Sequence, residues 1–529
     1  GTTMGTVTDA TGHYFLKNLP EGNFVMEVSS VGYKTIIRSV TLKKGKTLEE
    51  NFELEEDAIA LDGVVVSANR NETTRRMAPT LVNVVDLKLF ESTNSSTLSQ
   101  GLNFQPGVRV ETNCQNCGFQ QVRINGLDGP YTQILIDSRP VFSALSGVYG
   151  LEQIPASMIE RVEVMRGGGS ALFGSSAIAG TINIITKEPL RNSGQLSHTI
   201  TGFSGGNSFD NNTSLNLSLV TDDHRAGVYI FGQNRHRSGY DYDGDGFTEL
   251  PKLKNQTVGF RSYFKTSTYS KLTFEYHHLQ EFRRGGDMLN RPPHEANIAE
   301  QLEHAIDGGS LKFDYFSPNE KHRFSVFTSA ANTDRDSYYG GGQDPNAYGK
   351  TTDFTVMGGT QYMYSFGRCL FMPADLTAGL EYNRDHLEDN MWGYNRHTEQ
   401  TVNIYSGFLQ NEWKNEKWGI LLGGRLDKHN MVDHVIFSPR ANLRFNPTKD
   451  VNFRLSYASG FRAPQAFDED MHIENVGGTV SMIERAKGLK EEKSQSLSAS
   501  ADMYRRFGAW QVNFLVEGFY TALKDVFVL

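Results

Sequence analysis

The stretch Leu-Thr-Ala-Gly-Leu-Glu-Tyr-Asn at residues 376–383 alternates apolar with small or polar side chains. Successive side chains of a β-strand point to opposite faces, so this stretch predicts a strand with one apolar and one polar face. The same period of two recurs in other stretches: 215–219, 272–277 and 451–458. We found no helical period from residue 191 to the end, and we therefore expect residues 191–529 to form strand after strand.

Two architectures fit such strands. In a soluble sandwich the apolar faces form the core, whereas in a transmembrane barrel they face lipid and the polar faces line the lumen. The connections favour the barrel, because short turns alternate with long polar loops as in outer-membrane barrels. The short turns are residues 221–225, 267–270, 318–321 and 446–450, and the long loops are 239–253, 286–302, 340–350, 389–400 and 465–493.

The composition agrees with a barrel. Only 38% of the 529 residues are hydrophobic, and the stretch of about 18 apolar residues that a membrane helix requires is missing. Strands with one polar face average out as hydrophilic, so low hydropathy is compatible with a lipid-facing sheet. The net charge of −9 excludes a typical nucleic-acid binder, which neutralises phosphates with Lys and Arg.

A second region, residues 76–190, has a mixed α/β pattern with a glycine-rich segment between strands. Its motifs resemble the plug domain of TonB-dependent outer-membrane receptors, in the right order along the chain: 123–126, 133–140, 159–167, 170–175 and 179–187. The resemblance implies a mainly β protein, in which a large antiparallel transmembrane barrel (191–529) encloses an α/β plug (76–190).

The first 58 residues predict a small β-sandwich, with candidate strands at 5–9, 12–16, 23–31 and 35–42. The pattern from Gly5 to Gly22 resembles the carboxypeptidase-regulatory-like domain, beginning part-way through it. From residue 193 we count about fifteen strand candidates, the last at 526–529, whereas the barrels of this resemblance close with about 22. We therefore expect an open barrel, with about seven strands and part of the first domain outside this stretch.

Residues 59–75 predict a linker, and its run Asp62-Gly63-Val64-Val65-Val66 stands where the resembling receptors carry their TonB box. A short β-branched segment can add a strand to the edge of a partner's sheet. The alternative interpretation is a last strand of the N-terminal sandwich.

By resemblance, substrate binds between the extracellular loops and two plug apices, expected at residues 112–119 and 139–150. The candidate contacts are Asn113, Gln115, Asn116, Phe119, Arg139, Phe142, Tyr149, His294 and His472. The last of these follows Phe461-Arg-Ala-Pro464, a motif noted among haem receptors, but Ala486-Lys-Gly-Leu489 stands where the haem pattern has an Asn-Pro box.

Cys114 and Cys117 lie in the first apex. Outside the inner membrane the environment is oxidising, which favours a short-loop disulfide, and capture of a soft metal is the alternative. In the loop 239–253, Asp241, Asp243, Asp245 and Glu249 resemble the start of an EF-hand-type calcium loop. Position 12 of that pattern is Lys252 rather than Glu, so an acidic, solvated turn is the alternative.

Catalysis is not expected. His278 and Glu281 are spaced like metal ligands but fall in a period-two strand, where their side chains point to opposite faces. The resemblance instead implies active uptake of a ferric siderophore, cobalamin or haem-like ligand across the outer membrane of a Gram-negative bacterium. The implied partners are TonB, its inner-membrane ExbB/ExbD motor, the lipid bilayer and a candidate surface lipoprotein. An oligosaccharide importer and a non-transporting β adhesin or glycan binder are the alternatives, and the adhesin predicts no plug inside the strands.

Overall fold

A computed structural model describes residues 4–6, 8, 12–17, 19–28, 33, 35–54, 63–114, 116, 118–140, 154–175, 177–203, 208–466, 474–476, 479–508 and 510–528. Six predicted site residues lie outside these ranges: Asp62, Gln115, Cys117, Phe142, Tyr149 and His472.

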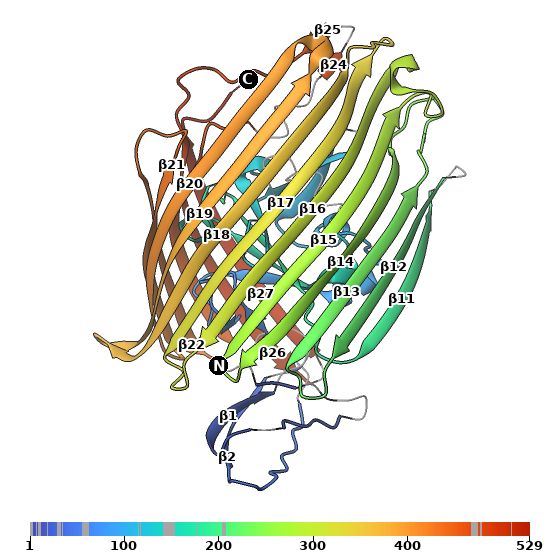
Figure 1. Ribbon diagram of the computed structural model, residues 1–529. Coiled ribbons are helices and arrows are strands. Elements are labelled where there is room, and N and C mark those ends of the chain that lie inside the picture. The colour runs from blue at the N-terminus through green and yellow to red at the C-terminus, as the bar shows by residue number, and fades with distance from the viewer. Residues whose placement is uncertain are drawn as a thin grey trace.

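The largest element is a 15-stranded antiparallel sheet that curves into a barrel wall (Figure 1). Each strand is hydrogen-bonded to the next, and no described pairing joins the first, β11, to the last, β27. The strands are β11 (Ser193–Gly202), β12 (Phe209–Val220), β13 (Ala226–Arg237), β14 (Lys252–Ser267), β15 (Ser270–Gly286), β16 (Ile298–Phe316), β17 (His322–Gly341), β18 (Tyr348–Cys369), β19 (Met372–Met391), β20 (Arg396–Lys414), β21 (Trp418–His429), β22 (Ile436–Thr448), β23 (Val451–Arg462), β26 (Glu492–Phe507) and β27 (Trp510–Lys524). The expected open barrel of about fifteen strands is confirmed. The prediction that its last strand lies at 526–529 is wrong, because the last strand, β27, ends at Lys524.

The period-two pattern is realised as two faces of the wall. Leu380 is 68% exposed on the outer face, whereas its neighbour Glu381 is 7% exposed on the lumen side. Near the short turns the outer face carries aromatic side chains, a feature of barrel surfaces at the membrane interface. This aromatic band comprises Tyr362, Tyr364, Phe366, Trp413, Trp418, Phe445 and Phe453, and the rings of Trp418 and Phe445 are 4.3 Å apart.

The long loops gather at one end of the wall and the short turns at the other, where β1 and β2 also lie (Figure 1). Short 3-10 helices lie in two of the long loops, η3 (Pro293–Glu295) and η4 (Trp392–Tyr394), and β24 (Glu474–Val476) pairs with β25 (Thr479–Ser481) in another. We refer below to the long-loop end and the short-turn end. No helix within the described ranges is long and apolar enough to span a membrane.

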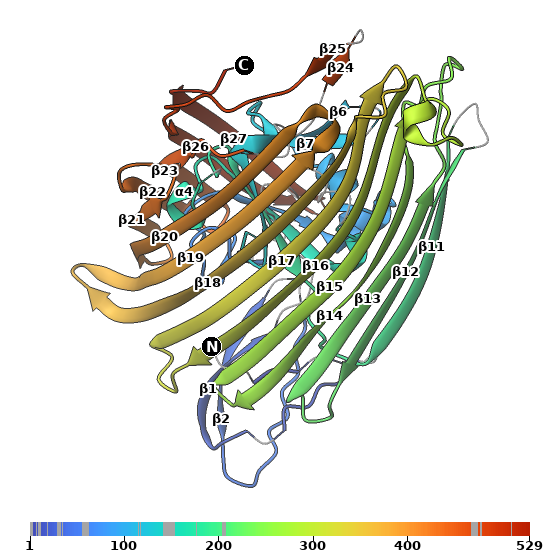
Figure 2. The ribbon, with the colours of Figure 1, turned by 45° about the horizontal axis from the view of Figure 1, so that its top comes forward.

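Inside the wall lies a compact domain built on a four-stranded sheet in the order β5-β9-β10-β8 (Figure 2). Its core is apolar and includes Leu98, Ile124, Val162 and Ile182. The elements are β5 (Val82–Asp86), α1 (Leu87–Ser92), α2 (Leu98–Leu102), β6 (Val108–Cys114), β7 (Phe119–Ile124), η1 (Gly129–Tyr131), β8 (Thr132–Ile136), η2 (Ala156–Met158), β9 (Ile159–Arg166), α4 (Ser170–Phe173) and β10 (Gly180–Thr186). This arrangement confirms the expected plug.

The N-terminal segment contains one described sheet, in which β1 (Gly22–Val28) pairs with β2 (Ile36–Leu42). The expected strand at 12–16 is wrong, since those residues form no strand. The valine run of the predicted TonB box contributes β3 (Val64–Val65), which pairs with β4 (Thr73–Thr74) rather than with β1 or β2. Among the described residues it is therefore not a last strand of the N-terminal sheet.

We predict that Leu380→Arg destabilises the protein by about 2–4 kcal/mol, the cost of a cation on the lipid face near the bilayer midplane. Unfolding by urea in lipid vesicles measures this cost. Glu399→Arg is the matched control, because Glu399 is an exposed side chain nearer the long-loop end, and its stability should stay close to the unsubstituted protein's. Equal effects of both substitutions would contradict a lipid-facing surface around Leu380.

Candidate functional site

The predicted TonB box is docked on the plug. Val65 is fully buried against Ala68, Ala78 and Val82, and the Gly63 carbonyl accepts a hydrogen bond from the Arg75 amide at 2.9 Å. Val64, Val65 and Val66 are thus already part of a folded unit. A partner that pairs with this strand must first displace it from the plug.

A buried carboxylate holds the end of the box. Glu163, fully buried on β9, accepts hydrogen bonds from the main-chain amides of Val66 and Ser67, both at 2.9 Å, and from the Ser67 hydroxyl at 2.7 Å. Asn183 lies beside Glu163 on β10 and donates to Ser67 Oγ at 2.9 Å. Bonds to a charged acceptor are stronger than neutral ones, so this contact is a strong polar link between the end of the box and the plug sheet.

The residues after the box, 68–78, cross the lumen next to the wall, and we call them the strap. Lumen-facing side chains of the wall donate to its main-chain carbonyls: Arg440 Nη2 to Ala68 O at 2.7 Å, Gln410 Nε2 to Asn69 O at 2.7 Å, Gln361 Nε2 to Arg70 O at 3.2 Å, and Arg454 Nη2 to Arg75 O at 3.0 Å and Nε to Ala78 O at 3.2 Å. The wall therefore holds the strap largely through its backbone.

Side chains of the strap also contact charged groups of the wall, since Asn69 Nδ2 donates to the buried carboxylate of Glu412 at 2.6 Å. Arg70 forms a buried ion pair with Glu381 of β19, which also pairs with Arg425 of β21 at 2.6 Å. The Arg70 guanidinium lies over the rings of Phe173 and Phe408, 5.0 and 4.6 Å from their centroids. Breaking one partner of a buried pair leaves an uncompensated charge, so this contact couples the strap strongly to the wall.

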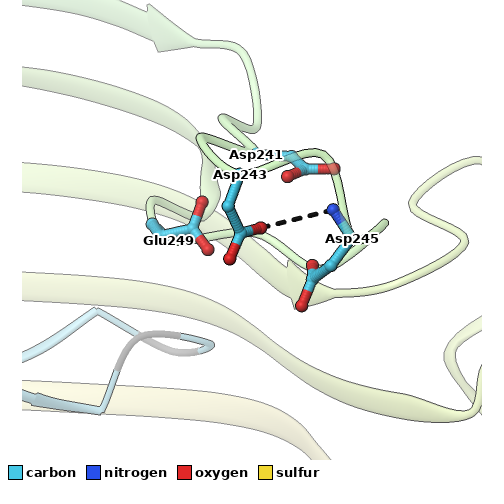
Figure 3. Close-up of side chains that lie close together, drawn as sticks. All are labelled: Asp241, Asp243, Asp245 and Glu249. Carbon is cyan, nitrogen blue, oxygen red and sulfur yellow. Dashed lines mark hydrogen bonds between the residues drawn. The ribbon is translucent and has the colours of Figure 1, made fainter.

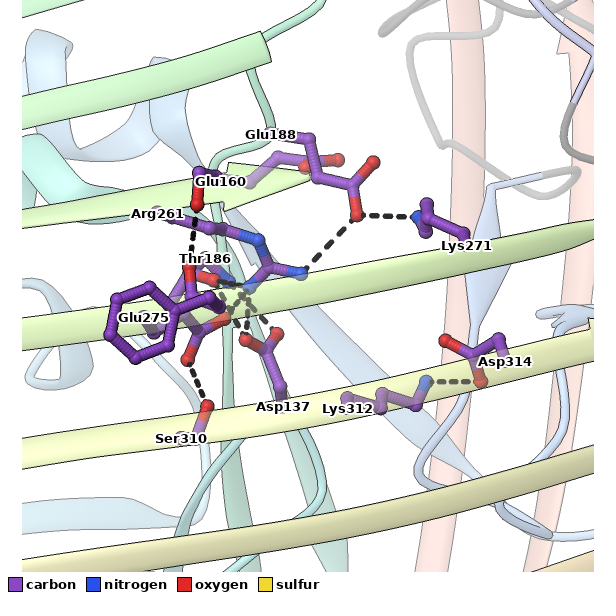
Figure 4. A network of polar contacts seen from close by, with 12 residues as sticks. Asp137, Glu160, Thr186, Glu188, Arg261, Lys271, Glu275, Ser310, Lys312 and Asp314 are labelled. Atoms are coloured by element: carbon purple, nitrogen blue, oxygen red, sulfur yellow. Dashed lines mark hydrogen bonds and ion pairs between the residues drawn. The ribbon is translucent and has the colours of Figure 1, made fainter. Parts of the chain in front are cut away.

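A second group of ion pairs joins the plug to the wall at the short-turn end (Figure 4). Arg261 of β14 pairs with Asp137 of the plug, with Glu275 at 2.5 Å and with Glu188 at 3.2 Å, and Lys271 reaches Glu188 at 3.0 Å. Burial tends to raise the pKa of Glu188, but the two cations outweigh it and lower that pKa to about 2.

The expected position of Arg139 at an outward-facing apex is wrong. β8 runs parallel to β10, and both run toward the short-turn end. Arg139, which follows β8, is buried there, with its guanidinium 5.2 Å from the ring of Phe327 near the start of β17. It therefore lies far from the β6–β7 turn that the same hypothesis placed beside it.

The β6–β7 turn does lie at the long-loop end. A Cβ on Gly285 of β15 would come within 1.9 Å of the Asn116 carbonyl oxygen, so the turn packs directly on the wall, as only glycine permits. Cys114 Sγ donates to Glu300 Oε2 at 3.0 Å. Cys114 is a thiol in this structure rather than half of a disulfide, so the predicted disulfide to Cys117, a residue outside the described ranges, has no support here. The side chains of Asn113 and Phe119 also lie outside the described residues.

The loop after β23 crosses the long-loop end to the opposite wall. Val480 of β25 packs with Cys114 against the buried cluster of Leu302, Tyr339 and Met391. His294 is half-buried on another loop, with Nδ1 2.7 Å from the Tyr348 hydroxyl, and does not join this group. The turn of the plug is thus covered by chain from two sides.

A cavity of about 260 Å³ lies between this part of the plug and strands β11–β13. Its lining is mostly hydroxyl, amide and charged groups, including Asn103, Thr112, Gln120, Thr201 and Arg237. A space of this size and polarity suits a polar, oxygen-rich solute better than an apolar one.

The acidic loop is compact (Figure 3). One carboxylate oxygen from each of Asp241, Asp243, Asp245 and Glu249 lies within 4.8 Å of the others. Asp241 also accepts hydrogen bonds from the amides of Gly244 and Gly246, at 2.7 and 2.9 Å. Calcium binding by this exposed loop stays a prediction.

Sequence reasoning missed Glu163, Asn183 and the wall arginines. A signal for the first two was present, since each is a polar residue inside an otherwise apolar strand, Val-Glu-Val at 162–164 and Ile-Asn-Ile at 182–184. The arginines occupy lumen positions of the period-two pattern, but that pattern does not predict which carbonyl of the strap each one bonds to.

Family models match the chain in three consecutive parts. They are the CarboxypepD_reg-like domain (residues 1–66), the TonB-dependent Receptor Plug Domain (74–181) and the TonB dependent receptor-like, beta-barrel (183–529). The chain belongs to the TonB-dependent receptors, a family of receptors and transporters rather than enzymes. The plug also contradicts the adhesin hypothesis, which predicted none.

The chain is similar to the vitamin B12 transporter BtuB of Vibrio vulnificus (strain CMCP6), 37% identical over 125 residues. That match covers 24% of this chain and only 20% of the relative. Among solved structures it is similar to the siderophore receptor PirA from Acinetobacter baumannii (18% identity, TM-score 0.71, 85% of this chain and 71% of that one) and to the alcaligin receptor FauA from Bordetella pertussis (14% identity, TM-score 0.64, 88% and 76%). At these identities the structural likeness shows the fold.

We predict that Glu163→Ala accelerates amide hydrogen exchange at Val66 and Ser67. Each lost bond to the carboxylate is worth about 1.5–3 kcal/mol, which corresponds to roughly tenfold or more in the exchange rate. Exchange followed by mass spectrometry measures this. Glu160→Ala is the matched control, because Glu160 lies on the same strand and, like Glu163, pairs with Arg161, but it accepts no bond from Val66 or Ser67. Unchanged exchange at the box in Glu163→Ala would show that the carboxylate does not hold it.

We also predict a pH dependence from Glu188. Because its folded pKa lies below its ordinary value of 4.5, its ionised form stabilises the plug–wall contact above that pH, and the contribution is lost as the pH falls toward about 2. Melting temperatures should therefore fall less on acidification in Glu188→Gln than in the unsubstituted protein. Glu320→Gln, on an exposed turn, is the control and should track the unsubstituted protein. Parallel curves for Glu188→Gln would contradict the assignment.

Proposed function

We propose that this chain mediates TonB-dependent uptake of a scarce nutrient across the outer membrane of a Gram-negative bacterium. The observation that carries the proposal is the docking of Val64–Ser67 on a plug that lies within the barrel wall. A plug blocks passive flow, so uptake needs the plug to rearrange, and the chain offers a short strand near the periplasmic side on which a partner can act.

The energy for that rearrangement must come from outside the chain. The barrel has access to neither ATP nor an ion gradient, and the docked plug is a stable state. We therefore propose TonB as the partner, driven by the inner-membrane ExbB/ExbD motor and pairing with the box by strand addition. A surface lipoprotein remains a further candidate partner.

The ligand we propose is a ferric siderophore or cobalamin. Support comes from the relatives, whose names describe siderophore receptors and a vitamin B12 transporter, and from the polar cavity beside the β6–β7 turn. A haem-like ligand is less favoured, because His294 is bound to Tyr348 away from that turn. An oligosaccharide is the second candidate, and the hydroxyl and amide lining of the cavity favours it equally. Direct binding to purified protein with a panel of iron complexes, cobalamin, haem and oligosaccharides separates these ligands.

Deleting residues 62–66 should abolish energised uptake and leave ligand binding unchanged, because the box lies at the opposite end from the long loops. Uptake of the ligand that the panel identifies, measured with and without proton-motive force, tests the first part, and equilibrium binding tests the second.

A point variant sharpens the test. Val64→Pro removes a main-chain donor that strand addition needs, whereas the matched Val64→Ala keeps it. The proline variant should lose uptake and the alanine variant should retain it. Loss of binding in either variant, or uptake that survives the deletion, would overturn the proposal.

A further inference from the structure

The turn between β18 and β19 differs from most of the described turns at the short-turn end. Most of those turns are polar, for example Ser-Pro-Asn-Glu-Lys at 317–321 and Asn-Glu-Lys at 415–417, whereas this one places Leu370 and Phe371 at its tip. The β26–β27 turn, which is flanked by the exposed rings of Phe507 and Trp510, is another apolar turn at this end. Leu370 is 79% exposed and Phe371 53% exposed. Two large apolar side chains at a solvent-facing turn are costly unless something covers them.

The hairpin also extends past its neighbours. β17 pairs with β18 only as far as Tyr364, and β20 pairs with β19 only from Ala374. Residues 367–372 therefore project beyond both adjacent strands, by about three residues or roughly 10 Å. Both views of the molecule show this hairpin, the light-orange turn between β18 and β19, standing out sideways from the wall (Figures 1 and 2). We call residues 366–373 the spur.

The backbone conformation at the tip of the spur does not favour leucine. Leu370 has a φ of 59°, a left-handed conformation that glycine adopts at no cost and a side chain disfavours by about 1–2 kcal/mol. The following amide, of Phe371, donates to the Cys369 carbonyl at 2.8 Å, which closes the turn tightly. A large apolar residue at such a position indicates that its side chain makes a compensating contact.

The aromatic residues around Leu370 indicate the environment in which its side chain lies. The ring of Phe371 stacks on Trp413, with centroids 5.7 Å apart and planes at 16°, and the Trp413 indole donates to the Cys369 carbonyl at 3.0 Å. Phe366 packs edge-on against Tyr364 at 4.6 Å. These partners belong to the aromatic band of the outer face, so the spur continues the lipid-facing surface rather than starting a new one.

We propose that the spur is an interfacial anchor whose tip inserts into the inner leaflet of the membrane around the barrel. Leu370 and Phe371 enter the boundary between headgroups and acyl chains, as the apolar face of an interfacial segment does. The exposed side chains of Arg368, on the spur, and Lys417, on the adjacent turn, supply cations for lipid phosphates at the same level. The proposal needs the barrel to lie in a membrane but does not depend on which ligand is transported.

The test uses a nitroxide label on Gly367→Cys in a background with the three native cysteines changed to serine. A Cβ at Gly367 meets no atom within 4 Å, so the label leaves Leu370 and Phe371 in place. The protein is placed in nanodiscs of phosphatidylethanolamine and phosphatidylglycerol, and power-saturation EPR compares collisions with oxygen and with a water-soluble nickel chelate. Asn319→Cys, on a polar turn at the same end, is the matched control.

The label at Gly367 should collide more with oxygen than with the nickel chelate, and the label at Asn319 should show the reverse. Adding L370S and F371S should shift the Gly367 label to the values of the control. Nickel accessibility at Gly367 equal to that at Asn319 would overturn the proposal and would point to a protein partner that nanodiscs lack. Shielding that survives the two serines would overturn it as well, because the apolar tip would then not be the anchor.

Discussion

The structure depends on one constraint: the lumen face of the barrel wall is polar, and the charges buried there must be satisfied. A lumen full of water would do so for an open channel, but here the plug occupies the space, and much of its surface supplies the partners. Arg440 and Arg454 donate to main-chain carbonyls of the strap that leads into the plug, Glu381 pairs with Arg70 of the strap, and Arg261 pairs with Asp137 of the plug. The interface between plug and wall is therefore held by directed polar contacts more than by apolar packing.

Polar contacts of this kind suit a part that has to move. An apolar interface loses free energy roughly in proportion to the area separated, whereas a hydrogen bond in a hydrated lumen can be exchanged for one to water at small net cost. The amides of Val66 and Ser67 bond to the plug through a single carboxylate, Glu163, and the strap after them bonds to the wall at six described carbonyls. A pulling force on the box therefore acts first on the bonds between Glu163 and the amides of Val66 and Ser67. Only afterwards does it act on the several bonds between the strap and the wall.

Much of the fold could be predicted from sequence, because the signals are local. The alternation in residues 376–383 and the alternation of turn lengths indicated the wall, and the motifs between 123 and 187 indicated the plug. The site was harder. Arg139 was misplaced because the direction of β8 depends on its parallel pairing with β10, which local sequence does not reveal. Glu163 was missed as a functional residue because its partners are main-chain amides almost a hundred residues away. Nearly every residue has such an amide, so the sequence does not identify which ones Glu163 binds.

The way the wall holds the strap has an evolutionary consequence. Arg440, Gln410, Gln361 and Arg454 contact carbonyl oxygens, which every residue type carries. Side chains between 68 and 78 that do not contact the wall can therefore vary without weakening these bonds, provided the path of the backbone is kept. Asn69, Arg70 and Asn71 are exceptions, because their side chains bond to the wall. A receptor could thus exchange its box-proximal segment with that of a relative that keeps these three residues, whereas a transplanted wall would have to bring its own arginines.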